Sequence, residues 1–377
     1  MSPSASATGP WDVERDAHCL DDVERAAREV LPADVWDFVS GGSGGEVTLA
    51  ANRAALQRIA LVPRVLRDVV HCDPKTSLFG VPHAMPVAVA PVAYHQLLHP
   101  EGELAAARAA KEAGVPFTAS TLSSFPIEAI TGVGGTVWFQ LYWLRDREKT
   151  FELVERAEAA GCAALMPTVD VPWMGRRLRD VRNRFRLPAG VEAANLTWGS
   201  GSEAHRAPAS GSAVAAHTEA AFTPSLTWAD IEELRRRTRL PMILKGVLDP
   251  RDAARAVDVG ADGIVVSNHG GRQLDGAVAG VDVLEEIVAE VGGGCRVLLD
   301  SGIRSGTDVL RALALGADGV LVGRPVLWGL AAAGERGVGR VLTLLAEELR
   351  DALGLAGCDS VTAARAVRTV TRDRPRH

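Results

Sequence analysis

The feature that most constrains the fold is an alternation of short apolar runs with amphipathic segments. Most of the runs are followed by a segment in which apolar residues recur at helical spacing. The runs lie at 86–90, 116–120, 136–141, 163–170, 241–245, 263–267, 295–300 and 319–323. Because they are apolar throughout, they are typical of parallel strands that are buried on both faces. Eight such repeats predict an α/β protein with a (β/α)₈ (TIM) barrel rather than an open sheet.

The N-terminal part of the chain has a different pattern. The first 85 residues read as an N-terminal helical segment, with helices expected at 20–31, 33–39 and 46–57. We expect residues 1–19 to form a flexible N-terminus and residues 20–377 to form a single barrel domain.

The connection after the fourth strand is anomalous, because it has about 70 residues where the other units use about 20–35. Its stretch 200–222 consists largely of Ala, Ser and Gly. Such a composition is compatible with a disordered loop. The connection nevertheless emerges on the face where barrel active sites are found, and long loops there are commonly functional. We therefore expect a mobile, lid-like loop over about 188–225.

Composition and charge exclude several classes of function. The net charge of −6 provides no basic field for nucleic acid or an anionic membrane surface. The longest apolar runs have about half of the roughly 20 residues that span a bilayer. The N-terminus lacks the basic and apolar regions of a signal peptide. The five cysteines form no C-x-x-C pair, which favours reduced thiols in a cytoplasmic protein, and no histidine shows metal-ligand spacing.

Polar residues follow the predicted strands at their C-terminal ends, where barrel side chains converge. The last two strands end in Asp300-x-Gly302-x-Arg304 and in Gly323-Arg324. Free N–H groups at helix starts and guanidinium groups bind phosphate, and barrels commonly bind phosphate at this place. The alternative interpretation is that the glycines form tight turns and the arginines pair at the surface.

Five further residues at or near these ends are candidates for chemistry. Lys245 ends an apolar strand, where it can form a structural ion pair, form a Schiff base or lie beside an anionic ligand. His269 lies in a Gly-rich turn and is the best candidate for a base, with Asp170 available to orient its ring. Arg177 and Arg272 are candidates to bind a carboxylate substrate, although a solvated charged surface also explains Arg177.

Residues 267–275, Ser-Asn-His-Gly-Gly-Arg-Gln-Leu-Asp, resemble the active-site motif of the FMN-dependent α-hydroxy acid oxidase/dehydrogenase family. This family includes glycolate oxidase, lactate oxidase and mandelate dehydrogenase. Further stretches resemble the family in the same order along the chain, at 48–53, 99–103, 139–142, 168–177, 244–247 and 300–304. The resemblance extends from about residue 20 to residue 360, and together these stretches are highly specific.

The resemblance implies a barrel domain that binds FMN at its mouth. It implies that Lys245 lies at the N1–C2 oxygen edge of the flavin, that Ser267 contacts the flavin and that Asp300 holds the ribityl hydroxyls. The residues implied to line the flavin ring and ribityl chain are Ala90, Pro91, Val92, Ser120, Gln140 and Thr168. Those implied to bind the phosphate are Gly302, Arg304, Gly323 and Arg324.

The resemblance also implies the reaction, which is oxidation of an (S)-2-hydroxy acid to the 2-oxo acid with O2 as acceptor and H2O2 as product. His269 is implied as the base and Asp170 as the residue that orients it. Arg177, Arg272 and Tyr142 are implied to hold the substrate. The family is often tetrameric, so we expect a homo-oligomer.

Two departures from the family pattern bear on the substrate. Phe38 stands where the family commonly has a tyrosine that reaches the substrate carboxylate. Leu122 stands where members similar to glycolate oxidase have a bulky tryptophan. Both changes favour a larger, aromatic acid such as mandelate or 4-hydroxymandelate over glycolate.

Several alternatives stay open. One is a dehydrogenase of the same family that passes electrons to a quinone or a protein, and another is an oxidase for lactate or glycolate. A third is an FMN barrel isomerase, which does not need the pair formed by His269 and Arg272. A fourth is a non-catalytic flavin-binding protein, which would have lost one of these residues, whereas both are present.

Overall fold

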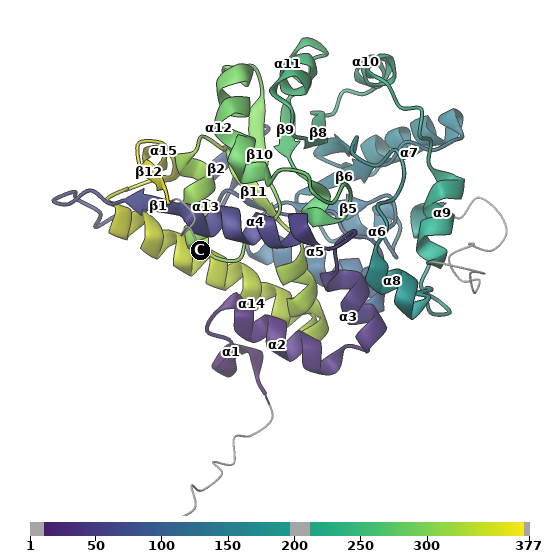
Figure 1. The fold of residues 1–377 in the computed structure, drawn as a ribbon, viewed down its shortest axis with the longest axis horizontal. Coiled ribbons are helices and arrows are strands. Elements are labelled where there is room, and N and C mark those ends of the chain that lie inside the picture. Colours follow the sequence, from purple (N-terminus) through teal and green to yellow (C-terminus); the bar gives the residue numbers. More distant parts are fainter. Residues whose placement is uncertain (1–10, 197–211, 373–377) are drawn as a thin grey trace, which may run out of the picture.

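The computed structural model describes residues 11–196 and 212–372. Eight parallel strands form one sheet in the order β7-β6-β5-β4-β11-β10-β9-β8 (Figure 1). The strands are β4 Val87–Val89, β5 Phe117–Ser120, β6 Val137–Leu141, β7 Ala164–Pro167, β8 Ile243–Val247, β9 Gly263–Val266, β10 Arg296–Leu299 and β11 Gly319–Val322. Parallel bridges from Leu165 to Met242 and from Thr168 to Lys245 join β7 to β8 and close the ring. All eight predicted strands and the barrel are therefore confirmed.

A separate apolar cluster fills the inside of the barrel. Ala88, Trp138, Ile243 and Leu321 are among its members, and each is at most 1% exposed. The hairpin β2 Thr76–Leu78 and β3 Val81–His83 contributes Phe79, whose ring meets Trp138 edge-on at 5.5 Å. The interior is thus a packed core, and the open space of the site lies beyond the strand ends.

Helices follow most of the barrel strands and cover the outside. They are α5 Gly102–Glu112, α6 Ile127–Thr131, α7 Arg147–Ala159, α11 Pro250–Asp258, α12 Gly280–Val291, α13 Gly306–Ala314 and α14 Arg324–Ala356. Alanine and leucine faces of these helices pack on the buried strands, which is why both faces of each strand are apolar. Within the described residues, no helix is long and apolar enough to cross a membrane.

The N-terminal helices are α1 Val13–Asp16, α2 Leu20–Val30, α3 Ala33–Ser40 and α4 Val47–Arg58. The three expected helices are confirmed, and α2 lies beside α14 (Figure 1). The expectation of helix throughout the first 85 residues is wrong for 59–83, which hold three strands. The first, β1 Ile59–Val62, pairs with β12 Arg368–Thr371 near the other end of the chain. This partner is about 300 residues away, so local periodicity does not reveal it. Residues 1–10 lie outside the described residues.

The long connection after β7 contains α8 Leu178–Asn183, a short 3₁₀ turn at Ala194–Leu196, α9 Ala213–Ala221 and α10 Trp228–Arg237. The loop expected at 188–225 therefore includes a helix, α9. Residues 197–211 of that loop lie outside the described residues.

The last helix, α15, lies far from this loop in the sequence and spans Val361–Ala364.

Helix α14 contains a kink that depends on close backbone contact. Ala333 and Gly334 have non-helical dihedral angles, and Gly329 and Gly337 lie on either side of them. A Cβ atom on Gly337 would lie 1.9 Å from the carbonyl oxygen of Gly329, so no other residue fits without a backbone shift. Gly339, in the same helix, has open space around the corresponding position.

This geometry predicts opposite effects for two substitutions in one helix. Gly337→Ala should lower the free energy of unfolding by about 1–3 kcal/mol, as overpacking typically does. Gly339→Ala should raise it by about 0.5–1 kcal/mol, because alanine is the better helix former. Thermal and denaturant unfolding of both variants measures the difference. Equal effects of the two substitutions would contradict the close approach.

Candidate active site

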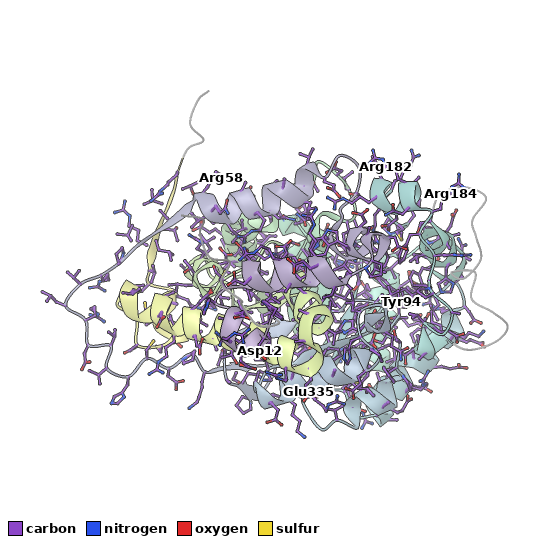
Figure 2. The ribbon with its side chains drawn as sticks, turned by 90° about the horizontal axis from the view of Figure 1, so that it is seen from below. Asp12, Arg58, Tyr94, Arg182, Arg184 and Glu335 are labelled. Atoms are coloured by element: carbon purple, nitrogen blue, oxygen red, sulfur yellow. The ribbon has the colours of Figure 1, made fainter. Side chains whose placement is uncertain are left out.

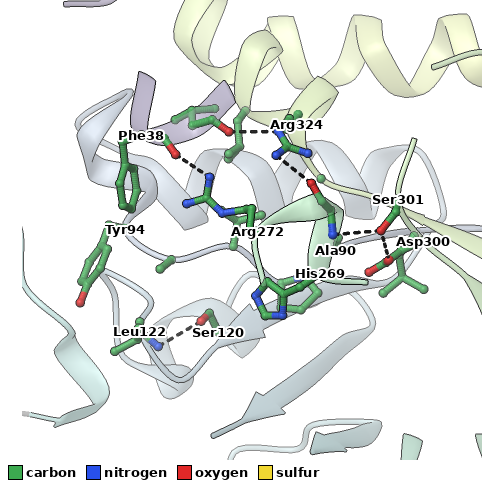
Figure 3. Close-up of a pocket in the computed structure, with 18 of the residues that line it drawn as sticks. Phe38, Ala90, Tyr94, Ser120, Leu122, His269, Arg272, Asp300, Ser301 and Arg324 are labelled. Atoms are coloured by element: carbon green, nitrogen blue, oxygen red, sulfur yellow. Dashed lines mark hydrogen bonds between the residues drawn. The ribbon is translucent and has the colours of Figure 1, made fainter. Parts of the chain in front are cut away.

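One pocket lies at the C-terminal ends of the barrel strands and contains about 1270 Å³ of space, part of it open to solvent (Figure 3). Helix α3 and helix α9 complete its walls. The expected site residues that line it are Phe38, Ala90, Pro91, Val92, Ser120, Leu122, Tyr142, Arg177, Lys245, His269, Arg272, Asp300, Gly302, Arg304, Gly323 and Arg324. The structure thus brings together residues from across the whole chain.

The remaining expected residues lie directly behind this lining. Gln140 accepts a hydrogen bond from Ser120 Oγ at 3.1 Å, and Ser267 accepts one from Lys245 Nζ at 3.1 Å. Thr168 lies next to Lys245 through a parallel bridge. Asp170 contacts His269, as described next.

His269 and Asp170 form a directed pair. The distance from His269 Nδ1 to Asp170 Oδ1 is 3.0 Å, and His269 Nε2 lies 3.5 Å from the hydroxyl of Tyr142. The tight turn after β9 presents the largely buried imidazole to the pocket: His269, Gly270 and Gly271 all have positive φ, at 58°, 68° and 74°. The glycines adopt this conformation without steric cost. Nδ1 therefore faces the carboxylate, and Nε2 faces the pocket.

Electrostatics favour the neutral form of this histidine. Burial lowers the pKa of His269 below 6.5 and outweighs the opposite effect of Asp170. Burial would raise the pKa of Asp170, but the charges of His269 and Lys245 outweigh it, so that its pKa is lowered. At neutral pH the pair is an imidazole beside a carboxylate, which is the state of a base ready to accept a proton.

Lys245 forms a buried ion pair with Asp300, with Nζ and Oδ2 3.2 Å apart. Burial alone would lower the pKa of Lys245, but Asp300 and Asp170 raise it overall. The amine is therefore charged, which supports the interpretation as an ion pair and disfavours the neutral amine that a Schiff base requires.

Four arginines around the pocket form no ion pair at contact distance within the described residues: Arg177, Arg272, Arg304 and Arg324. Desolvation by the surrounding protein lowers the pKa of all four, to about 9 for Arg304 and to about 10 for Arg324. Carboxylates farther away, such as Asp180 and Glu24, oppose the lowering of their pKa only in part. Arg177 Nε is buried and has no hydrogen-bond partner among residues 11–196 and 212–372. Cations held out of water without counter-ions are unfavourable. Their arrangement therefore calls for anionic ligands.

The arginines divide between two positions. Arg177 and Arg272 lie close enough to affect the pKa of Tyr142, next to the base. Arg304 lies beyond β10, and Arg324 begins α14, whose N-terminus has no side-chain cap. A helix N-terminus with two guanidinium groups nearby suits a phosphate, whereas the first pair suits a carboxylate beside the base.

The part of the pocket that lies between the two pairs of arginines fits a flavin. Two buried polar atoms at the barrel mouth, Gln140 Nε2 and Thr168 Oγ1, have no hydrogen-bond partner within the described residues. Groups of this kind need partners, and the polar edge of a flavin ring placed against Ala90, Pro91 and Val92 would provide them. No group of three or more His, Cys, Asp or Glu residues in the described chain is placed to hold a metal ion.

Sequence reasoning missed part of the wall, namely Tyr94, Met174, Val214, Thr218 and Phe222. Phe222 follows α9 and packs against Tyr142 with ring centroids 4.6 Å apart. One signal was available for Tyr94, because the chain has only two tyrosines and both line this pocket. Phe222 was a lone aromatic residue at the end of a stretch of small residues.

Fold and site together are typical of a barrel enzyme with one position suited to a phosphate-bearing cofactor and another suited to a small carboxylic acid beside a histidine. Comparison with known proteins agrees with this class. Residues 27–370 match the family described as FMN-dependent dehydrogenase. The chain belongs to this family of FMN-dependent 2-hydroxy acid oxidases and dehydrogenases.

Individual relatives are similar over nearly their whole length. A 4-hydroxymandelate oxidase from Amycolatopsis orientalis is 61% identical over 350 residues, which are 93% of this chain and 97% of that protein. An L-lactate oxidase from Nostoc sp. is 49% identical, over 91% and 95% of the two chains. The structure of a mandelate oxidase with (S)-4-hydroxymandelic acid superposes with a TM-score of 0.92 at 60% identity, over 94% and 99% of the two chains.

The pair formed by His269 and Asp170 makes a direct prediction. The carboxylate favours the protonated ring, so Asp170→Asn should lower the pKa of His269 further below 6.5. NMR titration of the histidine ring signals measures this shift, and Asp258→Asn, at an exposed position in α11, is the matched control. A ring that titrates at or above 6.5 in the unchanged protein, or a pKa that Asp170→Asn does not lower, would contradict the account.

Proposed function

We propose that the protein uses FMN to oxidise an aromatic (S)-2-hydroxy acid, 4-hydroxymandelate or mandelate, to the 2-oxo acid. The substrate loses two electrons and two protons, and O2 takes up both to give H2O2. The observation that carries the proposal is a neutral histidine beside two arginines that form no ion pair at contact distance within the described residues, in one pocket. The similarity to a 4-hydroxymandelate oxidase supports the choice of substrate.

The cofactor would be held by residues in or just after all eight barrel strands. Ala90, Pro91 and Val92 would support the ring, and Gln140 and Thr168 would supply donors to its polar edge. Ser120, Lys245, Ser267 and Asp300 would bind the flavin edge and ribityl chain, and Gly302, Arg304, Gly323 and Arg324 would bind the phosphate. When bound, FMN accepts the two electrons that leave the substrate.

His269 would accept a proton at Nε2 as the α-carbon is oxidised. Asp170 stabilises the imidazolium that forms and fixes the ring, because its Oδ1 faces Nδ1 at 3.0 Å. Tyr142 remains a neutral hydrogen-bond donor beside Nε2, since burial raises its pKa to about 12. The α-carbon and its oxygen form a carbonyl once the substrate has lost this proton, a second proton and the two electrons that FMN would accept.

Arg177 and Arg272 would bind the substrate carboxylate. Arg272 Nη1 donates to the carbonyl oxygens of Phe38, at 2.7 Å, and Gly41, at 2.9 Å, which fixes the orientation of its guanidinium. Its remaining donors are available for a ligand. Together with Arg177, this oriented guanidinium would hold the acid so that its α-carbon lies next to His269.

The opposite wall would select the side chain of the acid. Phe38 stacks on Phe185 at a centroid distance of 4.5 Å, and it brings an apolar ring rather than a hydroxyl to the pocket. Leu122 is 5% exposed and leaves space that a tryptophan would fill. An aromatic substrate gains about 2.5 kcal/mol for each 100 Å² of apolar area that it buries. Glycolate has no ring to bury and does not gain this free energy.

Replacement of the base tests the chemistry. His269→Ala should slow substrate-driven reduction of the flavin by about 10²–10⁴-fold. FMN should remain bound, because the imidazole would lie beside the substrate and not at the phosphate. Anaerobic stopped-flow absorbance measures the rate, and His71→Ala, at an exposed position, is the control. Reduction of the His269→Ala variant at the unchanged rate would show that another group accepts the proton.

The specificity argument predicts a ranking of substrates. The value of kcat/KM should be higher for 4-hydroxymandelate and mandelate than for lactate and glycolate, with H2O2 released in air. Phe38→Tyr combined with Leu122→Trp should shift the ranking towards the small acids. The added hydroxyl is worth about 0.5–1.5 kcal/mol to the carboxylate, and the indole occupies the space of the ring. Better turnover of glycolate than of mandelate by the unchanged protein would refute the assignment, and slow reoxidation by O2 would favour a dehydrogenase.

A further inference from the structure

The proposed substrate 4-hydroxymandelate has a phenol hydroxyl at the end opposite its reacting carbon, and the site described so far offers it no partner. In the described part of the chain, the pocket is lined by five side chains that carry a hydroxyl: Tyr94, Ser120, Tyr142, Thr218 and Ser301. Four of these already have hydrogen-bonding neighbours, namely Gln140 for Ser120, His269 for Tyr142, the carbonyl of Val214 for Thr218, and Asp300 for Ser301. The hydroxyl of Tyr94 is buried and has no partner among the described residues.

Tyr94 is fixed within the wall of the pocket. It is 1% exposed and lies within the body of the molecule, whereas Arg182 and Arg184 lie at its surface (Figure 2). Its backbone is left-handed, with φ at 59°, and its N–H donates to the carbonyl of Leu122 at 3.1 Å. Burial raises the pKa of its phenol, so the hydroxyl stays neutral and can both donate and accept. A buried hydroxyl without a partner is unfavourable, so a ligand hydroxyl that reaches it would satisfy it.

Tyr94 lies on the side of the pocket that an aromatic ring would reach. Figure 3 shows it between Phe38 and Leu122, across from His269. The carboxylate and the α-carbon of the substrate are held at the arginines and at His269, so its ring extends to the opposite wall. The para position is the part of the ring farthest from the base, and it therefore meets the wall that contains Tyr94.

We propose that Tyr94 receives the para-hydroxyl of an aryl 2-hydroxy acid and thereby sets a preference for 4-hydroxymandelate over mandelate. The inference rests on the proposed function and adds to it the residue that distinguishes two substrates differing by one oxygen atom. Two neutral phenols suit each other, because each donates one hydrogen bond and accepts another. This pairing also satisfies a polar group that the protein leaves unsatisfied.

The test compares the two substrates in matched variants of the FMN-loaded enzyme. Tyr94→Phe keeps the ring and removes the hydroxyl. It should lower the ratio of kcat/KM for 4-hydroxymandelate to kcat/KM for mandelate by about 3- to 10-fold, the size of one neutral hydrogen bond. Thr218→Val removes a pocket hydroxyl that is already bonded to the backbone, at 2.8 Å from the carbonyl of Val214, and should leave the ratio unchanged.

A second measurement does not depend on how well the variant folds. In the unchanged enzyme, 4-fluoromandelate should rank with mandelate and below 4-hydroxymandelate, because fluorine cannot donate a hydrogen bond. The inference is overturned if Tyr94→Phe leaves the ratio unchanged, if Thr218→Val lowers it equally, or if 4-fluoromandelate matches 4-hydroxymandelate. If neither 4-hydroxymandelate nor mandelate reduces the flavin, the proposed function itself is refuted. Reduction by both with an unmoved ratio would refute only the role of Tyr94.

Discussion

Positive charge at the mouth of the barrel that no ion pair within the described residues neutralises is the constraint on which the rest of the site depends. Arg177, Arg272, Arg304 and Arg324 surround one pocket, and no carboxylate of the described chain pairs with them. A folded protein keeps such an arrangement only at a cost in stability, which anionic ligands remove. Two anions match the two groups of arginines, namely the phosphate of the cofactor and the carboxylate of the substrate.

The same arginines connect the site to the fold. Arg324 donates to the carbonyls of Val39, Gly41 and Gly270, and Arg272 donates to those of Phe38 and Gly41. These bonds attach the end of α3 to the loops that follow β9 and β11. The position of Phe38 in the pocket wall is thus set by groups that would also face the anions. In the proposed function, substrate selection and cofactor binding are therefore coupled through one short segment.

The sequence alone was sufficient to predict the barrel strands. What it could not predict has physical causes. Each barrel strand is a local apolar run, so all eight could be predicted without knowledge of their partners. The pairing of Ile59–Val62 with Arg368–Thr371 could not, because it depends on a contact between distant parts of the chain. The residues expected at the cofactor were found at the pocket, since they sit at strand ends. Tyr94 and Phe222 were missed because a left-handed backbone and a helix outside the barrel aim them inward.

The central claim is that the arginines at the barrel mouth exist to bind anions, and the phosphate position tests it most directly. The flavin-free protein should be titrated with FMN and with riboflavin, which lacks only the phosphate, and binding followed by flavin fluorescence. Two charge-assisted hydrogen bonds of about 1.5 kcal/mol each correspond to a dissociation constant about 100-fold lower for FMN. The account predicts a difference at least this large, reduced in Arg304→Met. Equal affinity for the two flavins would contradict it.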